Sequence, residues 1–309
     1  MPSSPQSFRR YLLAFALMAG GGLLLVGCFN FFIDPYGVFG MNTLGIYASA
    51  DRESKPMAYA RGDFDAVIMG NSKAAMIPAA RLRNHRFFSA TFGGAMPEEL
   101  YYFAERNIHD ADLAIVMLDF WSFRSDPPVR YDPFAPQSFA QVVEKLLSIT
   151  AVEDSIKTLR RKVSGEQPAF APDGSFIAER WIESKSQPND ILRKLEFREH
   201  ARWFVDYEPS PERMAYLEKL ADLFRERGIP VVVVLAPMHE ESLALMDGTP
   251  AAEIESRWKS KVRALFPQTI DLIDSGYSAP ENFFPADPTH FRPEVGVEMI
   301  NREVLGRNE

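Results

Sequence analysis

The sequence predicts an α/β fold in which helices cover both faces of a doubly wound, mostly parallel sheet of five strands. One observation is a set of short apolar runs bounded by turn-forming residues, as buried parallel strands have. These runs are residues 66–69, 87–92, 113–118, 230–236 and 269–273. The other is the helical period of apolar residues between the runs. Strands that alternate with helices favour a parallel sheet, and we expect the strand order 2-1-3-4-5.

The covering helices are predicted from the same periodicity. They are expected over residues 97–107, 211–227, 251–265 and 293–305. Gly228 and Pro230 end the second of them, because glycine favours a helix C-terminus and proline cannot continue a helix.

An α-rich insertion is expected over residues 121–209, between the third and fourth runs. A simple crossover between parallel strands takes roughly ten to a few dozen residues, and this segment is longer. Its pattern predicts helices over 137–163 and 190–204, with a loop near 167–175. Trp121, Trp181 and Trp203 lie in it, and either they pack a small core or one of them stacks on a sugar ring.

The N-terminal segment is long and apolar enough to span a membrane. Residues 11–33 carry no charge, and Arg9 and Arg10 precede them. The positive-inside rule then makes residues 1–10 a cytoplasmic tail and places everything after Asp34 outside. We therefore expect a transmembrane signal anchor, followed by a linker over 34–62 and a folded domain over 63–309.

A lipoprotein signal is the alternative for this segment. Leu25-Val26-Gly27-Cys28 fits the pattern in which the cysteine is lipidated after cleavage. Phe29, Phe31 and Phe32 continue the apolar run, whereas lipoproteins usually turn polar there. In both cases the domain is tethered to a membrane.

Composition and motifs exclude several classes of function. The chain of 309 residues has a net charge of −8 and no Lys/Arg cluster interleaved with aromatic residues, so we expect no nucleic-acid partner. Cys28 is the only cysteine, so the domain after it forms no internal disulfide and offers no thiolate to zinc. No phosphate-binding or dinucleotide motif is present, and no known ligand spacing supports a metal site at His239, Glu240, Asp119 and His290. We expect no metal and no cofactor.

Ser72 stands where a predicted strand passes into a helix. The run 66–69 precedes Gly70 and Asn71, and residues 73–76 read as the first helical turn. Backbone N–H groups at a helix N-terminus favour negative charge, so an oxyanion formed by attack of Ser72 would lie among donors. The alternative role of Ser72 is to cap that helix.

A second motif, Asp287-Pro288-Thr289-His290, lies near the end of the chain. Its spacing lets the Asp287 carboxylate reach one ring nitrogen of His290 while the other nitrogen faces a serine, and we expect a single turn to hold the two residues. Ser72, His290 and Asp287 are thus candidates for a nucleophile, its base and the residue that orients the base. The alternatives are a histidine on a surface loop and an aspartate that starts a turn.

The triplet Gly70-Asn71-Ser72 and the Asp-x-x-His pair resemble those of the SGNH (GDSL-like) hydrolases and acyltransferases, over residues 63–305. The apolar N-terminus, Asp34-Pro35-Tyr36-Gly37 and residues 290–296 are similar to membrane-anchored bacterial proteins of alginate O-acetylation. The lipase elbow differs, since it needs a second glycine where Ala74 stands. The resemblance implies a flavodoxin-like sheet and serine acyl-transfer chemistry.

An oxyanion hole is expected from the backbone N–H groups of Ser72 and Gly94, because glycine at the end of the second strand lets the backbone approach the reacting centre closely. The alternative is that Gly93 and Gly94 only make a tight turn. Members of the superfamily usually add an asparagine after the third strand, and Asp119 stands there in this chain. A carboxylate cannot donate unless it is protonated, so either Asn71 supplies the missing donor or the hole is weaker. Ligands of such sheets bind beyond the carboxyl ends of the strands, which makes Asp119, Trp121 and His239 candidates for substrate contact. A surface-loop position is the alternative for His239.

Sequence and resemblance together predict a serine acyltransferase or esterase that is anchored in the bacterial inner membrane by a single pass and faces the periplasm. We expect it to act on O-acyl groups, O-acetyl above all, of a cell-envelope or exported polysaccharide. The expected partners are that acylated carbohydrate, the membrane and a membrane-bound acyl carrier protein. The alternative is a non-catalytic SGNH-like module for binding or assembly in a polysaccharide biosynthesis complex, which Asp119 favours.

Overall fold

The computed structural model describes residues 5–48, 51–168, 170–177 and 179–306. Contacts among its residues divide the chain into two compact units. One comprises residues 1–57 and 135–169, and the other residues 58–134 and 170–309. The segment predicted as one insertion over 121–209 therefore contributes to both units.

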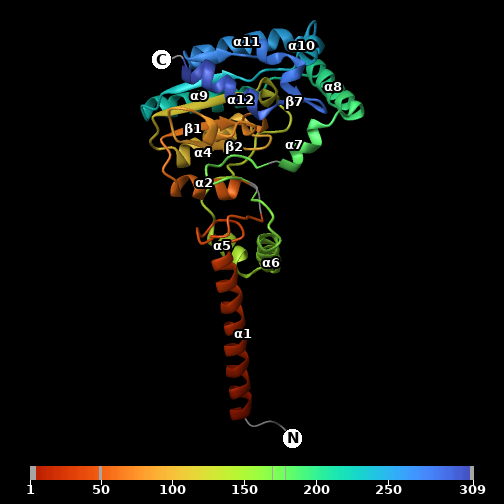
Figure 1. Cartoon of the computed structure of the whole chain (residues 1–309). Helices are drawn as coiled ribbons and strands as arrows, with labels where there is room; N and C mark the ends of the chain where they lie inside the picture. The colour runs from red at the N-terminus through yellow and green to blue at the C-terminus, as the bar shows by residue number, and fades with distance from the viewer. Residues whose placement is uncertain (1–4, 49–50, 169, 178, 307–309) are drawn as a thin grey trace. The chain divides into compact units, whose positions relative to one another are not determined.

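Within the described residues, the larger unit is built on a five-stranded parallel sheet in the order β2-β1-β3-β4-β5, which confirms the predicted order. Figure 1 labels its strands β1 and β2. The strands are β1 Ala66–Gly70, β2 Phe87–Thr91, β3 Leu113–Leu118, β4 Val231–Leu235 and β5 Thr269–Asp271. Alternate residues of β1 enter separate cores on the two faces: Val67 and Met69 on one, Ala66 and Ile68 on the other.

Helices cover both faces. The core that holds Val67 includes side chains of α4 Pro97–Asn107, α9 Pro211–Glu226 and α11 Pro250–Leu265. The opposite core includes side chains of α12 Pro293–Met299 and of the π-helical segment Ile300–Leu305, which together occupy the predicted helix 293–305. The predictions for α4, α9, α11 and the insertion helix α8 Asp190–Val205 are confirmed, with ends that agree within one residue.

Several short elements were not predicted from the sequence. They are the helices α2 Asp51–Arg61, α7 Glu179–Ser186 and α10 Glu240–Met246, and an antiparallel pair of strands, β6 Phe283–Phe284 and β7 Asp287–Phe291. None of them has a long apolar period, so local sequence alone does not specify them.

The smaller unit contains α1 Pro5–Ile33, α5 Phe139–Leu147 and α6 Ile149–Val163. Residues Gln6–Ile33 of α1 are long and apolar enough to cross a membrane. The helix predicted over 137–163 is broken at Ser148, which ends α5 and begins α6 because its hydroxyl accepts the Ala151 N–H at 3.0 Å.

Gly70 allows β1 to pass directly into the short helix α3 Ser72–Ala75. A Cβ atom on Gly70 would lie 2.6 Å from the Cβ of Ala74 and 2.8 Å from the carbonyl oxygen of Met117 on β3. Both distances are shorter than van der Waals contact, so no larger residue fits without a shift of backbone. The glycine thus sets how closely Ser72 approaches the end of β3.

We expect Gly70→Ala to lower the free energy of unfolding by about 1–3 kcal/mol, because the added methyl group must push packed backbone apart. Thermal and denaturant unfolding of the full chain in detergent would measure this loss. Gly276→Ala is the matched control, since nothing lies within 4 Å of the methyl group it adds. Equal stability of the two variants would show that the junction after β1 relaxes without cost.

Candidate active site

A pocket of about 200 Å³ lies beyond the carboxyl ends of β1, β3 and β4 in the larger unit. The candidate catalytic, oxyanion and substrate-contact residues from the sequence line it: Asn71, Ser72, Gly94, Asp119, Trp121, His239, Asp287 and His290. The carboxyl ends of parallel strands share one edge of the sheet, which is why residues so far apart in the chain meet there.

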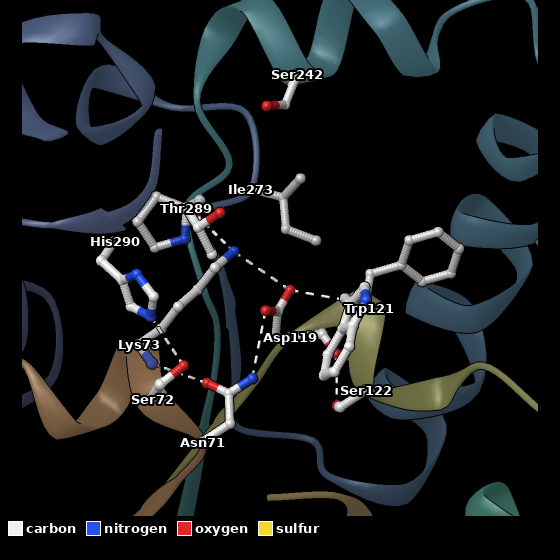
Figure 2. A network of polar contacts seen from close by, with 12 residues as sticks. Asn71, Ser72, Lys73, Asp119, Trp121, Ser122, Ser242, Ile273, Thr289 and His290 are labelled. Atoms are coloured by element: carbon white, nitrogen blue, oxygen red, sulfur yellow. Dashed lines mark hydrogen bonds and ion pairs between the residues drawn. The ribbon is translucent and has the colours of Figure 1, made fainter. Parts of the chain in front are cut away.

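Ser72, His290 and Asp287 form a continuous hydrogen-bonded chain. The Nε2 atom of His290 lies 2.8 Å from the Oγ atom of Ser72, as the dashed line in Figure 2 marks, and its Nδ1 atom lies 3.0 Å from Oδ2 of Asp287. The helix cap at this point is Asn71, whose Oδ1 accepts the Lys73 N–H at 3.0 Å, so the capping role considered for Ser72 is wrong. The hydroxyl of Ser72 is instead hydrogen-bonded to Nε2 of His290.

The segment that carries Asp287 and His290 is a bulged strand and not the single turn that we expected. Phe284 of β6 pairs with Asp287, and the adjacent Phe283 pairs with Phe291. One step along β6 thus corresponds to four steps along β7. The three residues between the two pairs, Pro288, Thr289 and His290, bulge out. The N–H groups of Thr289 and His290 donate to Oδ1 of Asp287 at 2.9 and 3.2 Å, which closes the bulge around the carboxylate.

Asp287 is ionised at neutral pH. Burial opposes its ionisation, but the hydrogen bond with His290 and the charges of His290 and Lys185 outweigh burial and lower the pKa of Asp287. Lys185 Nζ lies 3.6 Å from its Oδ2, and Trp181 packs edge-on against the imidazole with ring centroids 5.3 Å apart. An ionised Asp287 accepts the proton on Nδ1 of His290, so Nε2 is the nitrogen that is free to take the proton of Ser72.

A buried ion pair lies beside the serine. Lys73 Nζ lies 3.3 Å from Oδ1 of Asp119, with the two side chains only 6% and 8% exposed, and the amide of Asn71 donates to Oδ2 at 3.3 Å (Figure 2). Asp119 also accepts the Trp121 N–H at 3.4 Å. Asp119 is therefore an acceptor that holds Asn71 and Lys73. Lys73 was not singled out from the sequence, because a lysine between a serine and two alanines is expected to be exposed to solvent.

His200 is a second residue that was not predicted. Its Nδ1 lies 2.7 Å from the hydroxyl of Ser242 and its Nε2 lies 3.0 Å from the hydroxyl of Thr289 on the β7 bulge. Burial, and then the charge of Lys73, lower the pKa of His200 to about 4 against the attraction of Asp119 and Asp287. The sequence signal was the spacing of Phe197 and Phe204 around it, three residues before and four after, which marks a buried helix face.

His239 is buried, so its alternative as a surface-loop residue is wrong. Its side chain lines the pocket and is 3% exposed, and its Nδ1 accepts the Glu241 N–H at 3.1 Å at the start of α10. Burial lowers the pKa of this histidine. Glu196 of α8 also lines the pocket, and burial, with the nearby charge of Asp287, raises its pKa.

Trp121 and Trp203 form the aromatic wall of the pocket, with ring centroids 5.7 Å apart. The indole N–H of Trp121 is buried and has no hydrogen-bond partner among the described residues. Gly94 also lines the pocket, from the loop between β2 and α4, with a φ of 60° that favours glycine.

A cluster with metal-ligand spacing lies away from this pocket. In the described part of the chain it consists of Asp65, His85 and Asp112. Asp65 and Asp112 directly precede β1 and β3, and His85 lies two residues before β2. Asp65 is already engaged there, since it accepts the backbone N–H of Arg86 at 2.7 Å and the Arg86 guanidinium at 3.3 Å.

No family model matches the chain, and no curated protein matches it.

We expect Lys73 and Asp119 to be energetically coupled. Lys73→Met or Asp119→Asn alone leaves a buried charge without its partner and should lower the free energy of unfolding by about 3–5 kcal/mol. The double variant buries neither charge and should lose clearly less than the sum, as unfolding of all three variants would measure.

The pair Glu253 and Arg257 provides the matched control for this cycle. Its atoms lie 3.6 Å apart, but the side chains are 83% and 66% exposed, so its coupling should be within about 1 kcal/mol of zero. Additive losses at Lys73 and Asp119 would contradict a mutual interaction there.

We expect His200 to make the fold sensitive to acid. With a folded pKa of about 4 and an ordinary unfolded value, the unfolded state binds more protons between those values, so stability is complete above about pH 6.5 and falls as the pH drops. Between pH 7.5 and pH 5 the loss should be about 2 kcal/mol, and it should be absent in His200→Gln. Parallel pH profiles of unfolding for the two proteins would contradict this.

Proposed function

We propose that this protein is an SGNH-type serine acyltransferase or esterase, anchored in a bacterial inner membrane by α1, that acts on O-acyl groups of a cell-envelope or exported polysaccharide. The observation that carries the proposal is the chain of hydrogen bonds from Asp287 through His290 to Ser72, at 3.0 and 2.8 Å, inside a pocket. A serine hydroxyl is a weak nucleophile, and a histidine base oriented by a carboxylate is a general way to activate it.

In the proposed reaction the Ser72 oxygen attacks the acyl carbonyl while Nε2 of His290 takes the serine proton. Asp287 stabilises the imidazolium through its bond to Nδ1. The tetrahedral intermediate then collapses, its C–O bond to the leaving alcohol breaks, and His290 returns the proton to that alcohol. A sugar hydroxyl or water then attacks the acyl-serine while His290 takes its proton, the bond between the acyl carbon and the Ser72 oxygen breaks, and His290 returns the proton to Ser72. The first acceptor gives transfer and the second gives hydrolysis.

The developing oxyanion needs hydrogen-bond donors, and Asn71 fits this role. One N–H of its amide is held by Asp119 and its Oδ1 is held by the Lys73 N–H, so the amide group is fixed beside Ser72 with a second N–H to donate. The backbone N–H groups of Ser72 and Gly94 are the other proposed donors. Lys73 neutralises Asp119, which would otherwise repel the oxyanion. These contacts support Asn71 as a replacement for the asparagine usual in the superfamily.

The pocket wall supports a carbohydrate acceptor of O-acetyl groups. Trp121 offers an aromatic face next to Trp203, which suits stacking on a sugar ring. The continuous helix through Cys28 to Ile33 favours the signal anchor over a lipidated Cys28. A membrane-bound acyl carrier protein is the proposed donor.

We expect Ser72→Ala to reduce hydrolysis of p-nitrophenyl acetate by the full chain in detergent on the order of 10⁴-fold, with an unchanged melting temperature. His290→Ala should be as severe, and the double variant no worse than either, because the two residues act as one unit. Ser242→Ala is the control from the same pocket and should stay within about tenfold of the wild type.

A wild type without esterase activity, or a Ser72→Ala variant that keeps it, would refute the catalytic proposal and favour the binding or assembly module.

A further inference from the structure

The junction between α5 and α6 is fastened to the C-terminal end of α1. Asn30 in the last turn of α1 is fully buried: its Nδ2 donates to the carbonyl of Leu146 at 2.8 Å, and its Oδ1 accepts the hydroxyl of Ser155 at 2.8 Å. One turn earlier, a methyl group on Gly27 would lie 3.3 Å from Cδ2 of Leu147. The nitrogen and the oxygen of the buried Asn30 amide are both hydrogen-bonded, and Gly27 lets Leu147 pack closely on α1. These contacts indicate a specific attachment.

This attachment lies at the level where α1 would leave a bilayer. Gln6–Ile33 has 28 residues, and at about 1.5 Å a residue it is roughly 42 Å long, more than the roughly 30 Å of a hydrocarbon core. Gly27 and Asn30 lie within about 9 Å of its C-terminal end by the same rise. The α5–α6 junction is therefore beside the interfacial layer of lipid headgroups.

Apolar side chains are exposed at this junction. Leu147 is 37% exposed and Ile149 is 79% exposed, one on each side of Ser148. On the face of α1 that carries Gly27, Leu23 lies one turn earlier and is 53% exposed, so apolar surface continues along α1 from the junction. Exposure of this apolar surface to water is unfavourable and promotes aggregation, whereas its burial at a bilayer boundary is favourable.

The rest of α6 leads away from the junction. Asp154 accepts the hydroxyl of Tyr36 at 2.8 Å, and Lys162 donates to the carbonyl of Leu44 at 3.0 Å, so α6 follows the chain that leaves α1. The cationic residues Arg160, Arg161 and Lys162 gather at its far end. The apolar end of α6 is thus at the bilayer level and the charged end is beyond it.

We infer that the α5–α6 junction is a second membrane-contacting element, in which Leu147 and Ile149 enter the boundary between headgroups and acyl chains of the lipid bilayer that α1 crosses. The occupant of this apolar surface is lipid, because the surface continues that of α1. The inference rests on the proposed membrane-spanning role of α1 and goes beyond the proposed acyl chemistry.

The test uses the full chain with Cys28→Ser, which removes the only native thiol. Ile149→Cys is labelled with the environment-sensitive fluorophore NBD, and the protein is reconstituted into phosphatidylethanolamine/phosphatidylglycerol vesicles with or without lipids that carry a doxyl group near the headgroup. The expected result is a loss of about half of the NBD fluorescence with the doxyl lipids.

Val163→Cys is the matched control, because it is 88% exposed and lies at the other end of α6, about 21 Å from Ile149 by helical rise. Its label should be unaffected by doxyl lipid and quenched by iodide in the water. Leu17→Cys, in the middle of α1 and 69% exposed, should be quenched by doxyl groups placed deep in the acyl chains.

The controls separate the two proposals. If the Leu17 label escapes the deep doxyl groups, α1 does not span the bilayer and the proposed anchor fails. If the Leu17 label is quenched but the Ile149 label behaves like that of Val163, the anchor stands and this inference alone is overturned. An Ile149 label shielded from both doxyl lipid and iodide would indicate a protein neighbour, and would likewise overturn it.

Discussion

The packing of Gly70 against Met117 is the constraint on which the pocket depends. β1 pairs with β2 on one side and β3 on the other, so whatever follows β1 enters the middle of the sheet edge. Because Gly70 has no side chain, Asn71, Ser72 and Lys73 follow it at once, within reach of Asp119 at the end of β3. One backbone contact thus brings a hydroxyl, an amide and an ammonium to one place, and the ion pair keeps the charge of the ammonium compensated.

The central fold could be predicted from the sequence because its signals are local and repeated. The strand Leu113–Leu118 is apolar throughout, as strands buried on both faces are, and the helix Pro97–Asn107 carries an apolar stripe. β6, β7, α7 and α10 lack such signals. Each is short, and contacts with distant parts of the chain stabilise them, as the hydrogen bond from the Ala286 N–H between β6 and β7 to the carbonyl of Lys185 in α7 does.

The candidate site divides in the same way. Ser72, Asp287 and His290 could be found because each stands in a short motif whose spacing has a chemical meaning. Lys73 and His200 have no such motif. Their burial is explained only by partners that the fold brings from elsewhere in the chain, Asp119 for the lysine, and Ser242 and Thr289 for the histidine. A buried charge or a neutral histidine is a property of its surroundings, and these become visible only in three dimensions.

Thr289 gives the bulge of β7 a further consequence. It stands between Asp287 and His290, and its hydroxyl contacts His200 on α8. The imidazole of His290 is therefore aimed partly by a helix that contributes no group to the proposed proton transfer. A displacement of α8 would carry Thr289 with it and change the bulge that holds His290 against Ser72. The position of α8 is therefore part of what aligns the site.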